Sequence, residues 1–524
     1  MNWLSSEWPM SNTEHGMLVV FGEFLRRQGL IDRLKQTPIE QKTYQHTPQD
    51  KLVEFLAGIM GGMEHLGDLN QAPHPIVQDA WVAEAWGQRE FAHYSGVSRT
   101  LEACDERSVA AVEEAIRQFS QPYIDAAVQA LLHKGEPIIY DLDLTGQSVS
   151  ATSTSYPEAA FGWMNDGVRL GYQLARVCLS PPQGERLWLA GFHHPGDTVS
   201  GACLKELVRA AEAQTRLRPR RRTELVQQRI HSQREGVAYR QRLVSRQQET
   251  LVRLQQTQYR LIGQLYQTEQ PTTARGRPPG ATLSACTERR QRRLARIERQ
   301  ISRCERIIAA HQARLTEQER ILAELQAWHR QLQADNRANP DPPPYLEVRM
   351  DAGFASGDNL TWLLEMGYSP NTKALNQRVT AALRGRLTDH TPWVRVGENA
   401  DMTAWGDYRL HDCPFPLTVA LERFKVKGEY HYATLIQYRD DGVLPTLPEW
   451  FHHYNARQTI EAGNKQLKGT FHVQHLMSRS LSGIRIQVLP KDRPGRQRSA
   501  VVKTVVDSVY RPCQPLVAEH ARPP

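Results

Sequence analysis

The sequence predicts an α/β protein: a mixed sheet flanked by helices, interrupted by a long helical coiled-coil hairpin and a β-rich insertion, with an all-helical N-terminal domain. Three observations support this fold class. Strand-like runs alternate with helical patterns in two separated stretches, 136–214 and 340–392. Apolar residues keep heptad spacing within 215–339. Runs rich in β-branched and aromatic residues then fill much of 393–445.

The composition limits the class of protein. With 40% hydrophobic and 23% charged residues, the 524-residue chain reads as globular, with about two to four domains. No apolar run reaches transmembrane length, and the start of the chain lacks the features of a secretory signal, which predicts a cytoplasmic protein without a membrane partner. Seven scattered cysteines without a CxxC pair indicate a reducing compartment and argue against a structural zinc site.

The positive charge belongs to one segment. Residues 215–337 contain 26 Arg, no Lys and 11 acidic residues, a net charge of +15, whereas the whole chain carries +8, so the remainder carries 8 − 15 = −7. A basic segment suits a polyanion, most commonly nucleic acid. The alternative is a long solvated helix that happens to be rich in arginine.

The N-terminal domain, residues 1–135, shows three helical patterns, the last and longest over 108–134. Before it stands the polar stretch SGVSRTLEACDERS, residues 95–108. We interpret this stretch as a loop followed by a helix cap; contact with DNA phosphates is the alternative.

The first part of the core, residues 136–214, begins with the apolar run PIIYDLDLTG, which predicts a strand with Asp141 and Asp143 near its carboxyl end. Two further strand-like runs follow, so that an antiparallel meander is expected. Thr198 or Ser200 is then placed to cap a helix.

The core resumes at 340–392 with the run PYLEVRMDAGFASGD, which predicts a strand with Asp351 at its carboxyl end. A glycine turn and a helix capped by Ser356 or Asp358 follow. Acidic side chains therefore stand at the ends of two predicted strands.

The segment between these two parts has heptad spacing in both of its halves. Two helices of roughly 50 residues, separated by the Pro/Gly-rich stretch 270–281, imply an antiparallel hairpin about 70–75 Å long. An intermolecular coiled coil is the alternative. The expected core residues are Val226, Ile230, Val237, Val244, Leu251, Leu254, Leu261 and Leu265 in the first helix, and Ile297, Ile301, Cys304, Ile308, His311, Leu315, Gln318, Leu322, Leu325, His329 and Leu332 in the second.

A polar stripe lies within the region 446–480. On one continuous helix, Tyr454, Arg457, Glu461 and Lys468 project within roughly 60° of one another. An acid flanked by an aromatic hydroxyl and two cations suits the binding of a metal ion next to a phosphate backbone. A solvated helix face with ordinary ion pairs is the alternative.

Three carboxylates are candidate metal ligands: Asp143, with Asp141 as its alternative, Asp351 and Glu461. Such sets bind a pair of Mg²⁺ ions about 3.5–4 Å apart, because Mg²⁺ prefers oxygen ligands. One ion activates a water or a 3′-hydroxyl, and the other stabilises the leaving oxygen of a phosphodiester. The set predicts phosphoryl-transfer chemistry, although each acid alone has the ordinary interpretation of a cap or turn residue.

The chain resembles the DDE transposases of bacterial insertion sequences, in the group marked by a Y-x2-R-x3-E-x6-K helix. Tyr454, Arg457, Glu461 and Lys468 fit that signature without a spacing error. The resemblance covers roughly residues 45–215 and 340–480.

Three further motifs carry the resemblance. DLDLTG resembles the strand of the first catalytic Asp, which usually stands shortly before a Thr; this favours Asp143 over Asp141. RMDAGFAS resembles the strand of the second Asp and gives Asp351, and FHHPGDTVS resembles the turn before the first core helix.

The resemblance implies a ribonuclease-H-like catalytic core with a β-rich insertion between Asp351 and Glu461. It implies a bacterial, nucleoid-associated enzyme that cuts double-stranded DNA at terminal inverted repeats and joins the 3′ ends to a target, as a homodimer in a synaptic complex. Two Mg²⁺ ions, replaceable by Mn²⁺, would be bound by Asp143, Asp351 and Glu461. Phosphates would be held by Tyr454, Arg457 and Lys468, and Trp405 would stack on a displaced base.

Two features depart from the family. The coiled-coil insertion has no family role; dimerisation of a synaptic complex and arginine contacts along DNA are both open. Residues 481–524 are irregular and rich in Pro and Arg, the pattern of a truncated or frameshifted end, which bears on activity rather than ancestry. A nuclease of the same fold without strand transfer, and a non-catalytic or degenerate DNA-binding protein, are the alternative functions.

Overall fold

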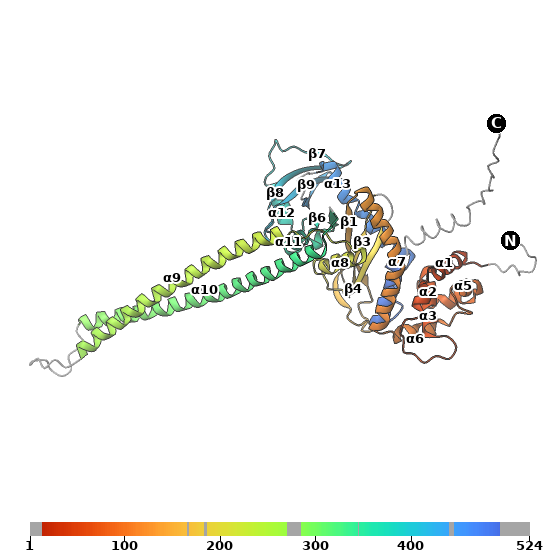
Figure 1. Cartoon of the computed structure of the whole chain (residues 1–524), viewed down its shortest axis with the longest axis horizontal. Helices are drawn as coiled ribbons and strands as arrows, with labels where there is room; N and C mark the ends of the chain where they lie inside the picture. Colours follow the sequence, from red (N-terminus) through yellow and green to blue (C-terminus); the bar gives the residue numbers. More distant parts are fainter. Residues whose placement is uncertain are drawn as a thin grey trace, which may run out of the picture. The chain divides into compact units, whose positions relative to one another are not determined.

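The computed structural model describes residues 13–164, 167–182, 186–269, 285–343, 345–439 and 445–492. The fold is mixed α/β: the described strands form one ten-stranded sheet with parallel and antiparallel pairs, and helices flank it (Figure 1). The chain divides into two compact units, one formed by residues 1–220 with 341–524 and the other by 221–340. No helix in the described part of the chain combines the length and apolar character needed to cross a membrane.

The N-terminal part is helical. Its elements are α1 (Gly16–Arg27), α2 (Leu30–Leu34), α3 (Pro48–Gly61), α4 (Asp68–Gln71), η1 (Ile76–Gln78), α5 (Ala80–Ala85), α6 (Tyr94–Ala103) and α7 (Glu106–Lys134). Trp86 is fully buried among them and donates its indole N–H to the Leu18 carbonyl over 2.9 Å. The predicted loop at 95–108 is wrong for most of its length, because α6 occupies it; the predicted cap is present, since Asp105 accepts from Ser108 N at the start of α7.

Glu54, in α3, gives this part of the fold a testable pH dependence. Burial raises the pKa of its carboxyl to about 8, although the Ala92 amide donates to it over 2.7 Å. A raised pKa in the folded state means that this contribution to stability is complete below the unfolded pKa near 4.5 and is lost as the pH rises through about 8. Between pH 5 and pH 9, the free energy of unfolding of Glu54→Gln should rise by about 2–4 kcal/mol relative to wild type, measured by urea denaturation.

The matched control is Glu84→Gln, a change of an exposed glutamate on α5. Its free energy of unfolding should follow that of wild type at both pH values. If Glu54→Gln also follows wild type, the buried carboxyl does not carry the pH dependence.

The first six strands form one side of the sheet. They are β1 (Ile138–Ser148), β2 (Ala160–Met164), β3 (Gly167–Leu179), β4 (Leu187–Pro195), β5 (Leu346–Arg349) and β6 (Ser369–Lys373). β3 pairs antiparallel with β1, β2 and β4, while β5 lies between β1 and β6 and is parallel to both. The predicted meander is therefore present, with β2 as an additional strand.

Helices connect these strands: α8 (Ser200–Thr215) follows β4, while η2 (Ala352–Phe354) and α11 (Gly357–Glu365) follow β5. The predicted cap of α8 by Thr198 or Ser200 is wrong, because Val199 occupies the cap position and no side chain caps it. Ser356 caps α11, as one of the two predicted alternatives, and accepts from Asn359 N over 3.2 Å.

The β-rich region continues the same sheet. After α12 (Gln377–Arg384) come β7 (Val394–Arg395), β8 (Ala400–Tyr408), β9 (Leu417–Val426) and β10 (Glu429–Gln437), which pair antiparallel in chain order. β10 also pairs with β6, so that the order across the sheet is β2-β3-β1-β5-β6-β10-β9-β8-β7, with β4 on β3. These strands extend the central sheet rather than forming a separate one.

The second unit is an antiparallel helical hairpin formed within one chain (Figure 1). α9 (Thr223–Glu269) and α10 (Ala285–Ala338) have 47 and 54 residues, about 70–80 Å each. Gln233 donates to the Gln318 carbonyl over 2.9 Å, which fixes their register. The predicted break at 270–281 lies outside the described residues. The most buried residues of the seam are Val226, Ile230, Val237, Val244, Leu261, Ile297, Ile301, Cys304, Ile308, Leu325 and Leu332.

The last helices are α13 (Leu447–Asn455), α14 (Gln458–Thr470) and α15 (Leu481–Asp492). The expectation of one continuous helix through the polar stripe is wrong, since Ala456 and Arg457 form a turn between α13 and α14. The expectation of an irregular region from residue 481 is wrong for α15, whose Ile486 is fully buried in the core built by the N-terminal helices.

Candidate functional site

Buried polar contacts fix α13 against β5 and β6. His453 Nε2 lies 2.7 Å from Glu347 Oε1, and Asn371 donates to the same oxygen over 3.0 Å. The Trp450 indole N–H donates to Asn371 Oδ1 over 3.1 Å. Burial opposes ionisation of Glu347, but the His453 contact and neighbouring charges still lower the pKa of this carboxyl. The helix that precedes Arg457 is thus held by side chains from two strands.

Asp141, on β1, organises the junction between α13 and α14. Arg349 pairs with its two carboxylate oxygens at 2.7 and 2.9 Å, and Arg186 pairs with it at 3.0 Å. The same arginines donate to the carbonyls that end α13: Arg349 to His453 over 2.6 Å, and Arg186 to Ala456 over 2.9 Å. These side chains therefore bond two carbonyls at the end of the helix, where backbone acceptors lack their usual intrahelical partners. Asp141 is a positioning residue for this junction.

Asp143 lies two residues further along β1, in the middle of the strand rather than near its end, because pairing with β3 continues to Ser148. Arg457 Nη1 is 3.5 Å from Asp143 Oδ1, and Asn464 Nδ2 donates to Oδ2. Burial raises the pKa of Asp143 to about 6, although Arg457 acts in the opposite direction. The site therefore favours a cation beside this carboxylate.

Asp351 follows β5 and begins η2, where its Oδ1 accepts from Gly353 N over 2.9 Å. Burial raises the pKa of this carboxyl as well, while the nearby Arg457 guanidinium lowers it. The Asp351 carboxylate also raises the pKa of Asp143, because a neighbouring negative charge disfavours ionisation. Parallel pairing of β1 with β5 brings these two acids together from positions 208 residues apart.

Arg457 is the cation at the centre of the group. It is 9% exposed, and its Nη2 lies 3.4 Å from Glu461 Oε1, one turn along the chain in α14. Glu461 itself is 54% exposed and faces solvent, whereas Asp143 and Asp351 are more buried. Two of the predicted carboxylates, Asp143 and Glu461, thus pair with Arg457, and the charge of the third, Asp351, also acts on it. Their oxygens do not all lie within 4.8 Å of one another, since no such group including them occurs among the described residues.

The other residues of the predicted stripe have different surroundings. Tyr454 is buried and donates its hydroxyl to the Met350 carbonyl over 3.4 Å; burial raises its pKa to about 12. Burial lowers the pKa of Lys468, and the neighbouring Arg176 acts in the same direction. Trp405 is half-buried on β8, next to an irregularity in its pairing with β9. The charge of Lys468 thus acts on Asp143, whereas Tyr454 is buried and bonds the backbone next to Asp351.

Two residues of the site were not predicted. Asn464 binds Asp143, and Arg176 lies opposite Asp143 in the β1–β3 register, with its guanidinium 5.1 Å from the centre of the Trp188 ring. An arginine within the apolar run LGYQLARVCL was the available signal for the second. Asn464 stands one turn after Glu461, a position that the stripe itself indicated.

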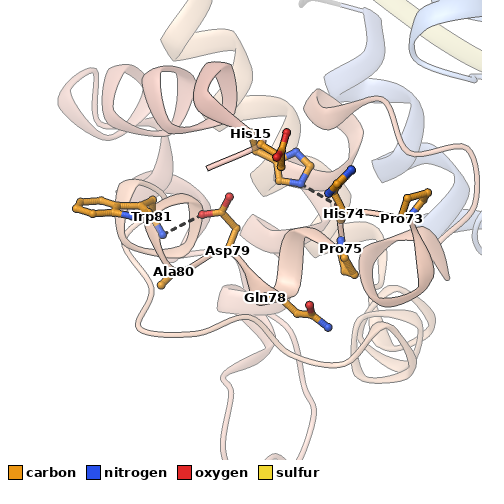
Figure 2. Close-up of a pocket in the computed structure, with 9 residues that line it drawn as sticks. His15, Pro73, His74, Pro75, Gln78, Asp79, Ala80 and Trp81 are labelled. Carbon is orange, nitrogen blue, oxygen red and sulfur yellow. Dashed lines mark hydrogen bonds between the residues drawn. The ribbon is translucent and has the colours of Figure 1, made fainter. Parts of the chain in front are cut away.

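The N-terminal part of the same unit has pockets away from this site. A pocket of about 320 Å³ is lined by residues from 14–15 and 73–81, including His15, His74 and Asp79 (Figure 2). His15 Nε2 contacts the His74 carbonyl at 3.0 Å, and Asp79 caps α5. None of the predicted site residues lines this pocket.

Comparison with known proteins assigns no family: no protein-family model matches the chain, and no curated protein is detectably similar to it.

Proposed function

We propose that this chain is a metal-dependent DNA transposase of the DDE class, which cuts element ends and joins the freed 3′ ends to target DNA. The observation that carries the proposal is the group of carboxylates around Arg457. Asp143, Asp351 and Glu461 come from β1, the end of β5 and α14, and the same guanidinium acts on all three. A bacterial cytoplasmic location and a homodimeric synaptic complex belong to the same proposal.

The sheet supports this class. The order β4-β3-β1-β5-β6 has an antiparallel meander followed by two strands parallel to the first, with α8 and α11 in the connections. This arrangement is expected of a ribonuclease-H-like core, with the first two acids on its neighbouring central strands. The β-rich region between Asp351 and Glu461 is an extension of that core.

The donor set fits Mg²⁺ or Mn²⁺, because the candidate ligands are all carboxylate oxygens. Two such ions would be held by Asp143, Asp351 and Glu461, and would supply an activated hydroxyl and a stabilised leaving oxygen. Burial raises the pKa of both aspartates, so a cation there compensates the cost of their ionisation. Arg457 provides that charge in this structure, and binding of metal would release its guanidinium toward a phosphate oxygen.

The outer face of α10 supports double-stranded DNA as the partner. Between residues 286 and 306, α10 has eight Arg and three Glu, a net charge of 8 − 3 = +5; between 307 and 338 it has four Arg and four acids, a net charge of zero. Six exposed arginines form a stripe with a repeating spacing of three and four, about 25 Å long. They are Arg289, Arg292, Arg296, Arg299, Arg303 and Arg306. This arginine stripe occupies the heptad positions that face away from α9, where phosphates can approach.

Loss of the arginine stripe should weaken DNA binding in a salt-dependent way. The triple variant Arg292→Gln, Arg299→Gln, Arg306→Gln removes one arginine from each heptad. The slope of log Kobs against log[salt] should fall by up to about 2.7, because each lost phosphate contact removes about 0.9. Fluorescence anisotropy of a labelled duplex between 50 and 200 mM salt measures both affinity and slope.

The matched control makes the same charge change in the neutral half of α10: Arg314→Gln, Arg320→Gln, Arg330→Gln. All three are exposed, and Arg320 is ion-paired with Glu317 and Glu324. This variant should keep the wild-type slope. If both triple variants have the same slope, the arginine stripe makes no DNA contacts of its own.

The function is tested with purified protein, Mg²⁺ and DNA that carries the inverted repeats flanking the coding sequence. Cleavage at the repeat followed by joining of the 3′ end to a second duplex is the expected result. Cleavage without joining would identify a nuclease of the same fold. Binding without cleavage, at all metal concentrations, would identify a non-catalytic DNA-binding protein.

A further inference from the structure

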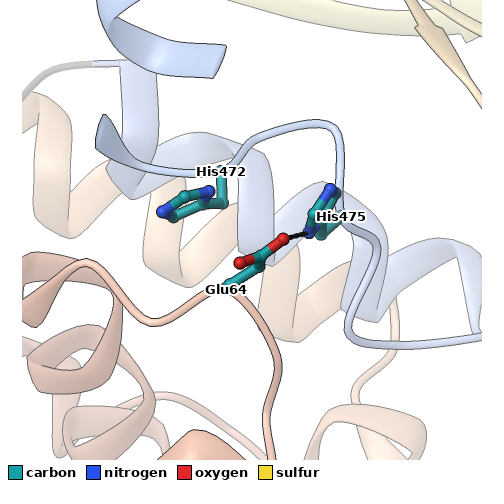
Figure 3. Close-up of side chains that lie close together, drawn as sticks. All are labelled: Glu64, His472 and His475. Carbon is teal, nitrogen blue, oxygen red and sulfur yellow. Dashed lines mark ion pairs between the residues drawn. The ribbon is translucent and has the colours of Figure 1, made fainter. Parts of the chain in front are cut away.

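Two loops of the first unit meet at a cluster of nitrogen and oxygen ligands apart from the carboxylate group. Glu64 lies in the loop after α3, and His472 and His475 lie in the loop after α14. One ligand atom from each lies within 4.8 Å of the other two. Figure 3 shows the Glu64 carboxylate extending from one loop toward the imidazoles of the other, with its Oε1 2.9 Å from His475 Nδ1.

The loop that carries the histidines is held on both sides. Phe471 and Val473, which flank His472, are 1% and 2% exposed in the hydrophobic core. Gln487 donates to the His475 carbonyl over 2.5 Å, and the His475 amide donates to the His472 carbonyl over 3.0 Å. Neighbours that fix a loop in this way orient ligands before a metal arrives.

His472 has a conformation that a bulky residue adopts at a cost. Its φ is +46°, in the left-handed region. Backbone strain of this kind is retained where the surroundings require it, and it is concentrated at functional sites. Here it accompanies the turn that brings His472 and His475 to one side of the loop. The His65 ring stacks on the His475 imidazole, with ring centres 5.1 Å apart and planes 8° from parallel.

We propose that Glu64, His472 and His475 bind one Zn²⁺ ion. Two imidazoles and one carboxylate are a three-ligand set that Zn²⁺ accepts, with water in the fourth position of a tetrahedron. The partial exposure of Glu64 (49%) and His475 (38%) leaves room for that water. Imidazole ligands favour Zn²⁺ over Mg²⁺, which prefers oxygen alone. The site would differ in metal preference from the carboxylate group.

Zinc at this position would join the N-terminal helices to the end of α14. Thr470 ends α14, and its carbonyl lies close to Gly62, at the end of α3: a Cβ added there would be 3.4 Å from it. Because Glu461 and Lys468 are on α14, an ion that ties its end to α3 would restrict the motion of the helix that carries them. This structural consequence does not depend on the proposed transposase activity.

Zinc binding is tested on the full-length chain, stripped of metal by a chelator and dialysed. Zn²⁺ is titrated in competition with a chromogenic chelator, with excess Mg²⁺ present to occupy oxygen-only sites. Wild type should bind one Zn²⁺ per chain, and His472→Ala and His475→Ala should each weaken binding more than about 100-fold. Co²⁺ in place of Zn²⁺ should give the visible absorption of a tetrahedral site, lost in both variants.

Three further variants make the result decisive. His133→Ala removes an exposed histidine at the end of α7 and should bind Zn²⁺ as wild type does. His475→Gln keeps a polar side chain beside Glu64 and covers the case in which alanine disturbs the fold. Asp351→Asn should keep the zinc affinity, which separates this site from the proposed catalytic one. Absence of zinc binding in wild type, or equal affinity in all variants, would overturn the proposal and leave only an ion pair.

Discussion

Asp351→Asn should lower the rate of Mg²⁺-dependent DNA cleavage by at least about 10³-fold while DNA affinity stays close to that of wild type. The change removes one carboxylate charge from the proposed metal site, which is worth several kcal/mol of transition-state stabilisation. Asparagine keeps the side-chain oxygen that accepts from Gly353 N, so that the start of η2 is preserved. Single-turnover cleavage and duplex anisotropy measure the two quantities separately.

The control for this change is Asp358→Asn. Asp358 is exposed in the first turn of α11, seven residues from Asp351, and has no place in the carboxylate group. It should cleave DNA at the wild-type rate. A wild-type cleavage rate in Asp351→Asn as well would place the chemistry on other residues.

Asp141→Asn should strongly destabilise the sheet, lowering the free energy of unfolding by about 3–5 kcal/mol. Asp141 is fully buried, and its charge compensates Arg349 and Arg186. An amide carries no charge, so both guanidinium groups would lose the ion pair that holds them here. The measurement is urea denaturation at pH 7.5.

Asp143→Asn is the matched comparison, because it makes the same chemical change two residues away on the same strand. Burial raises the pKa of Asp143 to about 6, so keeping its carboxyl ionised at pH 7.5 costs the folded state free energy. Removal of this charge should therefore leave the free energy of unfolding unchanged or higher. Cleavage, in contrast, should be lost in Asp143→Asn. Equal destabilisation by both changes would contradict the separation of a positioning aspartate from a metal-binding one.

The parts of the fold that depend on short-range patterns were predictable. Heptad spacing located the buried seam of α9 and α10, because a repeat of three and four residues is a local property. The strands β1, β3 and β4 were predictable as neighbours, since short connections favour antiparallel pairing. Ser356 at the start of α11 was predictable for the same reason, because capping depends on a few adjacent residues.

The break between α13 and α14 was not predictable from the stripe. A projection at 100° per residue assumes that the helix continues, and nothing local in HYNARQ contradicts it. The break depends on Arg349 and Arg186, which reach the carbonyls of His453 and Ala456 from distant segments. The pairing of Asp141 with Arg349 spans 208 residues, and no short window contains both.

β2 and α15 were missed for a related reason. AFGWM is short and contains a glycine, and α15 contains Gly483 with little helical periodicity. Each is stabilised by its neighbours: β2 by pairing with β3, and α15 by the burial of residues such as Ile484 and Ile486. Tertiary packing outweighs local propensity in both segments.

The candidate site was predictable in its residue types and less so in its geometry. Spacing identified Arg457 and Glu461, a strand end identified Asp351, and the resemblance favoured Asp143 over Asp141; the fold brings the charges of these residues together. The hydrogen bond of Asn464 to Asp143, and that of the buried Tyr454 to the Met350 carbonyl, depend on three-dimensional contacts that no short segment of sequence contains.

The base of the helical hairpin has a consequence for how such a chain can change in length. Arg221 and Asn336 hold each other by two hydrogen bonds, so the hairpin leaves and re-enters the chain at nearly one point. We therefore expect that whole heptads can be added or removed beyond that point without a change in the order of the strands. Removal of residues 393–437, in contrast, would leave β6 without its partner β10 and create an unpaired strand edge that is prone to aggregation. The same chain therefore contains one insertion that is a compact unit of its own and another whose strands are part of the main sheet.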